Sequence, residues 1–170
     1  MIKDLMFDAR SATWLEHDIF PYVLAAVEEL MPEQQLRVVA VHDLEPLAAV
    51  LQIRGLRCVV QDSGLGTAIL SVYRPAKPDP SQLVVLDYRQ RIADEVIRDL
   101  AAILYHLRPG EQFSVRGRGL PRNGLKALRQ IGAIIDVDID RFLEMLLLIT
   151  RSQVSSRPRK PVMPSKSRVN

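Results

Sequence analysis

Two short apolar stretches of the chain each end in Asp-x-Arg, at Asp8 to Arg10 and at Asp87 to Arg89. The guanidinium of arginine has a rigid fork that matches a carboxylate or a phosphate, so Arg10 and Arg89 are candidate anion ligands. The neighbouring Asp8 and Asp87 could use the same donors. The spacing therefore leaves two interpretations open, an anion site and an internal ion pair.

The segment 116–124, RGRGLPRNG, combines three arginines with three glycines directly before a predicted helix. Glycines let backbone amides approach an anion and arginines supply charge, so Arg116 and Arg118 are candidate ligands for a phosphate or a nucleic acid. The segment lacks both the P-loop lysine arrangement and the GxGxxG spacing. A solvated basic loop is the alternative.

His42 and Asp43 lie where a predicted strand ends and a helix begins, a position that often lines a site in α/β folds. Asp43 could equally cap the helix while His42 makes a surface hydrogen bond. An acid/base or metal role for His42 also stays open.

The single cysteine, Cys58, lies mid-strand, with Leu56 and Val60 on the same predicted face. We expect it to pack in a core, where desolvation raises a thiol pKa; a reactive thiol is the alternative. One cysteine and three scattered histidines give no metal-ligand spacing, so no metal or other cofactor is predicted. His17 and His106 are expected at solvated surface positions.

The elements that must position these residues repeat along the chain. Asp8 and Asp87 lie 79 positions apart, and a helix, a strand, a second helix and two strands follow each of them. In the first half we expect strands over 5–10, 36–41, 56–61 and 67–74, a helix capped by Asp18 with a buried stripe, and a helix from Asp43 to Gly55. The members of the stripe are Tyr22, Val23, Ala26, Val27 and Leu30.

In the second half we expect strands over 83–89, 112–116, 134–139 and 145–150, and helices over 93–107 and 123–131. The sequence thus predicts an α/β two-layer sandwich of two tandem β-α-β-α-β-β units, with the helices on one face of each four-stranded mixed sheet. Residues 1–75 and 83–150 are the units, 76–82 a proline-rich linker and 151–170 a tail. The seam between the units is the first place to look for function.

Charge is distributed unevenly along the 170 residues, which carry a net charge of +3. Six basic and no acidic residues lie in 151–170, so residues 1–150 hold 17 basic and 20 acidic residues. The tail is expected to be disordered and could contact a nucleic acid, although six dispersed charges are a weak signal. No leader and no apolar run near the ~20 residues of a membrane span is present, so a cytoplasmic protein without a membrane contact is expected.

The pattern resembles the TusA-like (SirA-like) sulfur carriers, and more closely a divergent branch of that superfamily whose function is not known. The resemblance lies in the two Asp-x-Arg strand ends, in LRPGE at 107–111, in VHDLEPL at 41–47 and in LQIRGLRCVV at 51–60. It covers both units and excludes the tail. It implies small two-layer β-α-β-α-β-β domains.

The family's carriers present a Cys-Pro pair six residues beyond the first-strand aspartate, where a helix N-terminus stabilises the thiolate. Here that slot holds Trp14 and Leu15 in the first unit and Ala93 and Asp94 in the second. None of these side chains can carry a persulfide, so we do not transfer the carrier function with the fold.

The sequence therefore favours a non-catalytic module that binds a small anion or a partner protein. The predicted ligand-binding residues are Arg10, His42, Asp43, Arg89, Arg116 and Arg118. The alternatives are a sulfur-transfer or redox accessory protein that uses Cys58, and nucleic-acid binding through residues 116–122 with the tail. Uncovered sheet faces also predict sheet-to-sheet packing, either between the two units or between two chains as a homo-oligomer.

Overall fold

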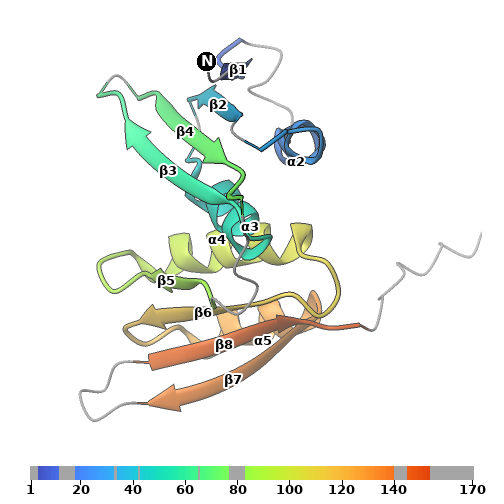
Figure 1. The fold of residues 1–170 in the computed structure, drawn as a ribbon. Helices are drawn as coiled ribbons and strands as arrows, with labels where there is room; N and C mark the ends of the chain where they lie inside the picture. The colour runs from blue at the N-terminus through green and yellow to red at the C-terminus, as the bar shows by residue number, and fades with distance from the viewer. Residues whose placement is uncertain are drawn as a thin grey trace, which may run out of the picture.

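Two units with the same order of elements make up the described part of the chain (Figure 1). The structure is a computed structural model and describes residues 4–11, 18–32, 34–41, 43–64, 66–76, 83–139 and 145–153. Each unit is β-α-β-α-β-β with two helices on one face of a mixed sheet, so the predicted fold class is confirmed. Within the described residues, no helix has the length and apolar character needed to cross a bilayer.

The first unit builds its sheet in the order β1-β2-β4-β3. Its elements are β1 (Asp4–Asp8), α2 (Phe20–Glu28), β2 (Gln35–Ala40), α3 (Glu45–Ile53), β3 (Arg57–Asp62) and β4 (Ala68–Tyr73). Strand β1 runs parallel to β2, whereas β2 with β4 and β4 with β3 are antiparallel. Leu36, Val38 and Ala40 of β2 alternate toward the helices and are buried, because successive strand side chains point to opposite faces.

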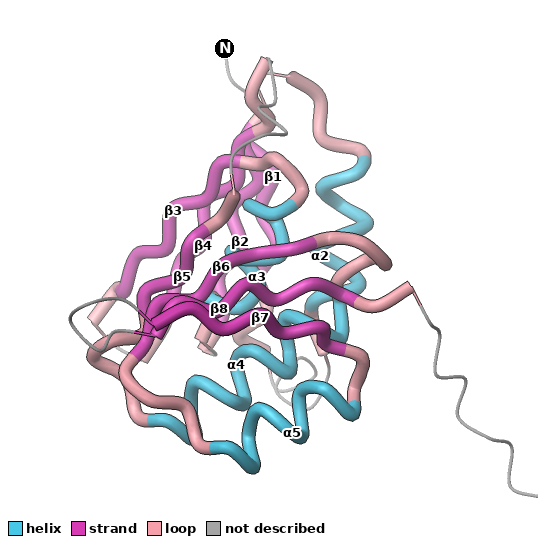
Figure 2. The backbone as a smooth tube through the Cα atoms, turned by 90° about the horizontal axis from the view of Figure 1, so that it is seen from below, coloured by secondary structure: helices cyan, strands magenta, loops and turns pink. Residues whose placement is uncertain are grey.

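The second unit repeats this topology in the order β5-β6-β8-β7. Its elements are β5 (Val85–Asp87), α4 (Ala93–His106), β6 (Gln112–Gly117), α5 (Arg122–Gln130), β7 (Ala133–Ile139) and β8 (Met145–Arg151). The register of the two parallel strand pairs is also the same. Asp8 pairs with Val39 in the first unit, and its equivalent, Asp87, pairs with Arg116 in the second. Figure 2 shows α4 and α5 on the same side of this sheet.

Helix α2 buries a narrower stripe than its sequence predicts. Val23, Val27 and Leu30 are at most 4% exposed, whereas Tyr22 is 51% exposed. Positions 23, 27 and 30 follow the i, i+4, i+7 spacing of one helix face, and residue 22 is turned about 100° away from residue 23. The prediction that Tyr22 belongs to the buried stripe was therefore wrong.

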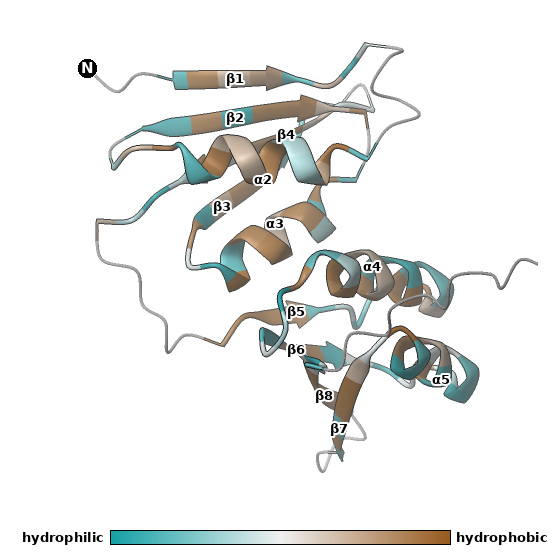
Figure 3. Cartoon of the chain, turned by 90° about the vertical axis from the view of Figure 1, so that its right-hand side faces the viewer, coloured by the Kyte–Doolittle hydropathy of each residue, from teal (hydrophilic) through white to brown (hydrophobic). Residues whose placement is uncertain are grey.

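The two units meet through their helices, and the sheets lie on the outside. Figure 3 shows α3 of the first unit against α4 of the second. Ala49 and Val50 of α3 are at most 1% exposed and belong to the hydrophobic core of the second unit. Sheet-to-sheet packing between the units, one of the two arrangements expected from the sequence, is therefore not what joins them.

Candidate anion-binding pocket between the two units

The seam between the units is held at its centre by His106, the last residue of α4. Its ring stacks on Phe20 of α2 with 4.2 Å between centroids, and its Nε2 lies 3.1 Å from Asp18 Oδ2. Burial lowers the pKa of His106, and the neighbouring Asp18 carboxylate opposes that shift. The His106 side chain is 12% exposed, so the expectation of a solvated surface histidine was wrong.

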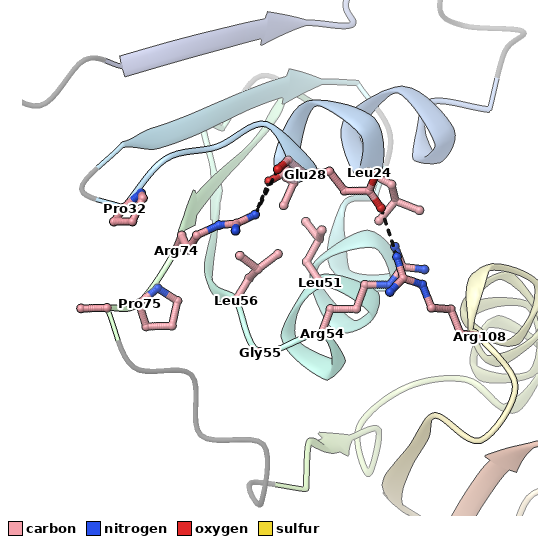
Figure 4. A pocket seen from close by; sticks show the side chains of 12 residues that line it. Leu24, Glu28, Pro32, Leu51, Arg54, Gly55, Leu56, Arg74, Pro75 and Arg108 are labelled. Carbon is pink, nitrogen blue, oxygen red and sulfur yellow. Dashed lines mark hydrogen bonds and ion pairs between the residues drawn. The ribbon is translucent and has the colours of Figure 1, made fainter.

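A cavity of about 380 Å³ opens at one end of this seam (Figure 4). Its apolar wall comes from the ends of α2, α3 and β4, and three arginines from both units line it with a single acidic side chain, Glu28. The full lining is Leu24, Val27, Glu28, Pro32, Leu51, Arg54, Gly55, Leu56, Arg74, Pro75, Ala76 and Arg108. An apolar wall with a few charged groups is the usual composition of a small-molecule site.

Each of the three arginines directly or closely follows the end of an element, which lets a long side chain fold back over the seam. Arg54 follows α3, Arg74 follows β4 and Arg108 follows α4. Arg54 Nη2 donates to the carbonyl of His106 at 2.9 Å, across the seam. The pocket therefore depends on both units.

Arg74 and Arg108 converge on the C-terminal end of α2. Arg74 Nη2 donates to the carbonyls of Val27 at 2.8 Å and Glu28 at 3.4 Å, and the Val27 carbonyl also accepts the Leu30 N–H at 3.1 Å. Arg108 Nη2 lies 3.1 Å from Glu28 Oε1, and this pair is exposed. Figure 4 shows the Arg108 and Arg54 side chains next to each other.

The arginine cluster is not fully satisfied by the described part of the protein. The Nε atoms of Arg54 and Arg74 are buried and have no hydrogen-bond partner there. Arg54 Nε lies 3.7 Å from Glu111 Oε1, which is an ion-pair distance but too long for a hydrogen bond. Burial lowers the pKa of Arg54 and the positive charge of Arg108 adds to this, whereas Glu111 and Glu28 oppose it. The cluster therefore combines two donors that lack an acceptor with a repulsion between Arg54 and Arg108.

The Asp-x-Arg strand ends form internal ion pairs in both units. Arg10 Nε and Nη2 lie 2.9 and 2.5 Å from the two oxygens of Asp8, and Arg89 makes the same fork with Asp87 at 2.9 and 2.5 Å. Hydrogen bonds from the paired arginines lower the pKa of each aspartate to about 2. Of the two interpretations left open by the sequence, internal pairing is the one observed.

Some of the predicted ligands come together in the second unit. Arg89 and Arg118 line an open pocket of about 460 Å³ with Arg91, and Arg116 lies on β6 next to Asp87. Arg118 has no ion pair or hydrogen bond within the described residues. Arg10 belongs to the first unit and does not line this pocket.

Asp43 caps a helix, which is the alternative to an anion site that the sequence left open. It also belongs to a cluster of charged side chains across the seam. Its Oδ1 accepts the Glu45 N–H at 2.9 Å, which caps the start of α3. Its Oδ2 lies 3.2 Å from Arg91, which also contacts Glu45 at 2.8 Å and Asp99 at 2.7 Å. One arginine of the second unit thus faces three carboxylates, two of them from the first unit.

Asp99 is the buried member of this cluster and its side chain is 10% exposed. The pKa of Asp99 is raised to about 6, because burial and the carboxylates of Asp43 and Glu45 raise it more than Arg91 and Arg98 lower it. Neither Arg91 nor Asp99 is among the residues predicted from the sequence. The available signal was Arg91 itself, which lies four residues after the Asp87 strand end and before a helix.

Cys58 packs against the core of the first unit, and burial raises the pKa of its thiol to about 12. It also borders an open groove of about 600 Å³ that Arg57 and Val85 line. The raised pKa keeps the thiol protonated at neutral pH, as the core-packing interpretation expects.

Gly124, the last glycine of the RGRGLPRNG segment, has a packing explanation. A Cβ at this position would lie 2.5 Å from Cδ1 of Ile97, so the missing side chain lets α5 approach α4. Its place in the sequence therefore does not require an anion. His42, His17, Trp14, Leu15 and all but the first three residues of the basic tail lie outside the described residues, and those predictions stay predictions.

Among the described residues, no group of three or more histidine, cysteine, aspartate or glutamate side chains is arranged to hold a metal ion. No protein-family model, no curated protein and no solved structure matches this chain.

Proposed function

We propose that this protein is a binding module that holds a small organic anion in the pocket between its two units. The observation that carries the proposal is the convergence of Arg54, Arg74 and Arg108 on a cavity of about 380 Å³ whose remaining wall is largely apolar. Two buried Nε–H groups in this cluster lack an acceptor within the described residues. Leaving such donors unsatisfied costs about 1–3 kcal/mol each, which a carboxylate or phosphate oxygen would recover.

The chemical class of the ligand follows from the wall. A volume of about 380 Å³ lies in the range of small-molecule sites, roughly 300–1,000 Å³. Leu24, Leu56 and Pro75 offer an apolar surface, and the arginines offer forks for one anionic group. A ligand with an apolar body and a single carboxylate or phosphate head fits these walls better than a bare inorganic ion.

Two features support binding rather than sulfur transfer. The two β-α-β-α-β-β units are consistent with a TusA-like origin, but Ala93 occupies the carrier-cysteine position of the second unit. The only thiol, Cys58, has a pKa raised by burial to about 12, which opposes thiolate formation. We therefore keep the sulfur-transfer alternative in second place.

Two probes test the proposal. Binding of anilinonaphthalene sulfonate is measured by its fluorescence, and binding of phenyl phosphate is measured by its displacement of anilinonaphthalene sulfonate. Arg108→Gln removes one guanidinium group that makes no hydrogen bond to the backbone of α2. Arg74→Gln removes a guanidinium group that also donates to carbonyls at the end of α2. We expect each variant to weaken both probes at least ~10-fold, the effect of losing one charge-assisted hydrogen bond.

Arg118→Gln is the matched control, because it removes an arginine from the open pocket of the second unit and leaves the seam intact. Its affinity for both probes should equal that of the wild type. Equal affinities in Arg108→Gln and Arg118→Gln, or no binding of either probe to the wild type, would exclude the seam pocket as an anion site.

A further inference from the structure

The outer face of the second sheet carries a charge pattern that is complementary to itself. Cross-strand pairing places Arg116 of β6, Leu146 of β8 and Asp138 of β7 in one row, in that order. These three side chains point away from α4 and α5, because their strand neighbours Val115, Leu147 and the buried residues of β7 face the core. A basic group therefore lies on one side of an apolar centre and an acidic group on the other.

The apolar centre of this face is exposed in the described structure. Leu146 is 38% exposed and Ile134, on β7, is 52% exposed. Figure 1 shows this sheet with α5 behind it. Arg116 and Asp138 have no hydrogen bond or ion pair within the described residues, and the acid next to Arg116, Asp87, is already held by Arg89.

We propose that two copies of this chain dimerise face to face through the second sheet, around a two-fold axis that runs along β8. Such an axis lies between the stacked sheets, places β8 over β8 and carries β7 of one copy over β6 of the other. Asp138 of the second copy then faces Arg116 of the first, and the symmetry makes this pair twice. Stacked sheets lie about 10 Å apart, a gap that an arginine and an aspartate side chain can span.

The first sheet offers an internal comparison, because duplication gives it the same row. There the equivalents of Arg116, Leu146 and Asp138 are Val39, Ile69 and Gln61. This row has no opposite charges on its two sides, so a two-fold axis along β4 gains no ion pair. The charge pattern thus selects the second sheet over the first as the dimer surface.

The size of the face sets the expected affinity. On this axis β6, β8 and β7 overlap between the copies and β5 does not, so the shared face is roughly 14 Å wide, and a seven-residue strand makes it about 23 Å long. A face of this size is at the small end of specific interfaces, so we expect a reversible dimer with a dissociation constant of about 10–100 µM. Sedimentation velocity of the full chain over a concentration series measures it.

Charge reversal tests the pairing directly. Arg116→Glu should weaken the dimer at least ~10-fold, since two acidic groups then face each other twice, and Asp138→Lys should do the same. The double variant R116E/D138K restores opposite charges and should return the dissociation constant to within about threefold of the wild type. Arg37→Glu, which makes the same change on the outer face of the first sheet, should have no effect.

A cysteine cross-link tests the axis independently of charge. Leu146 lies on the proposed axis, and sheets about 10 Å apart are too far apart for a disulfide, so Leu146→Cys in a Cys58→Ser background should be cross-linked into a dimer by a short bis-maleimide reagent. Ile69→Cys, its equivalent in the first sheet, should stay monomeric under the same conditions.

The proposal is overturned by a wild-type chain that stays monomeric throughout the concentration series. The proposal is also overturned if neither charge reversal changes the dissociation constant, or if the double variant dimerises no more tightly than the single variants. Cross-linking through Ile69→Cys instead of Leu146→Cys would assign the interface to the other sheet. Circular dichroism of each variant confirms that the exposed substitutions leave the fold intact.

Discussion

Asp99 should make the folded protein less stable as the pH rises from about 4 to 6. Its pKa is raised from 3.8 to about 6, mainly by burial and then by the nearby Asp43 carboxylate. Between these values the folded state holds a proton that the unfolded state has released, so the free energy of unfolding falls as the pH increases. The shift corresponds to roughly 3 kcal/mol, at 1.36 kcal/mol per pKa unit. That stability is fully present below pH 3.8 and lost above about pH 6.

The substitution Asp99→Asn isolates this contribution. Asparagine keeps the shape and one oxygen that can accept from Arg91, and it cannot ionise beside Asp43 and Glu45. We expect the variant to be more stable than the wild type at pH 7.5, by about 1–3 kcal/mol, and the difference to disappear at pH 4. Taking the difference between the two proteins at each pH removes the contributions of all other titrating groups.

Urea unfolding followed by circular dichroism at four pH values between 4 and 7.5 measures the effect. Asp94→Asn is the matched control, because it removes an exposed carboxylate from the same helix and should leave the Asp99 contribution unchanged. A stability difference between Asp99→Asn and wild type that stays constant with pH would refute the reasoning. A variant that is less stable at pH 7.5 would show that the Arg91 ion pair outweighs the burial of the charge.

Three further outcomes follow from contacts at the seam and within each unit. His106→Ala should lower the free energy of unfolding by about 1 kcal/mol through loss of the Phe20 stack, measured by urea unfolding, and the loss should shrink as the pH falls because the folded state disfavours the protonated ring. Gly124→Ala should cost about 1 kcal/mol, and Ile97→Ala should suppress that cost in a double-mutant cycle, since the added Cβ would meet the Ile97 side chain. Cys58 should react roughly 1,000-fold more slowly with a dithiobis-nitrobenzoate reagent in the folded than in the urea-unfolded protein, because its pKa rises from 9.0 to about 12; an equal rate would contradict the burial argument.

The fold could be predicted from the sequence because its signals are local and occur twice. The apolar run before Asp8 and its counterpart before Asp87 identify equivalent strands, and the spacing of Val23, Val27 and Leu30 identifies a helix face. The prediction for Tyr22 was wrong because its aromatic ring suggests burial. The direction in which a residue points on the helix decides its burial, and Tyr22 lies beside the buried face.

The candidate site could be predicted only as a location. The repeat in the sequence points to the seam, but the arginines that its motifs single out lie at strand ends, where Asp8 and Asp87 bind Arg10 and Arg89. Arg54 and Arg108 lie 54 positions apart, and only the packing of α3 on α4 brings their side chains together. Long-range packing of this kind leaves no periodicity or motif in a single sequence.

Because the seam pocket takes guanidinium groups from both halves of the chain, its occupancy and the geometry of the α3–α4 contact are thermodynamically linked. A molecule seated between Arg54 and Arg108 would hold the halves at one fixed angle, and a partner that altered this angle would change how tightly the molecule is held by the same factor. The first unit alone would not have this property, since Arg108 comes from the second unit. Arg108 is thus the side chain through which the second half of the chain would sense whether the pocket is filled.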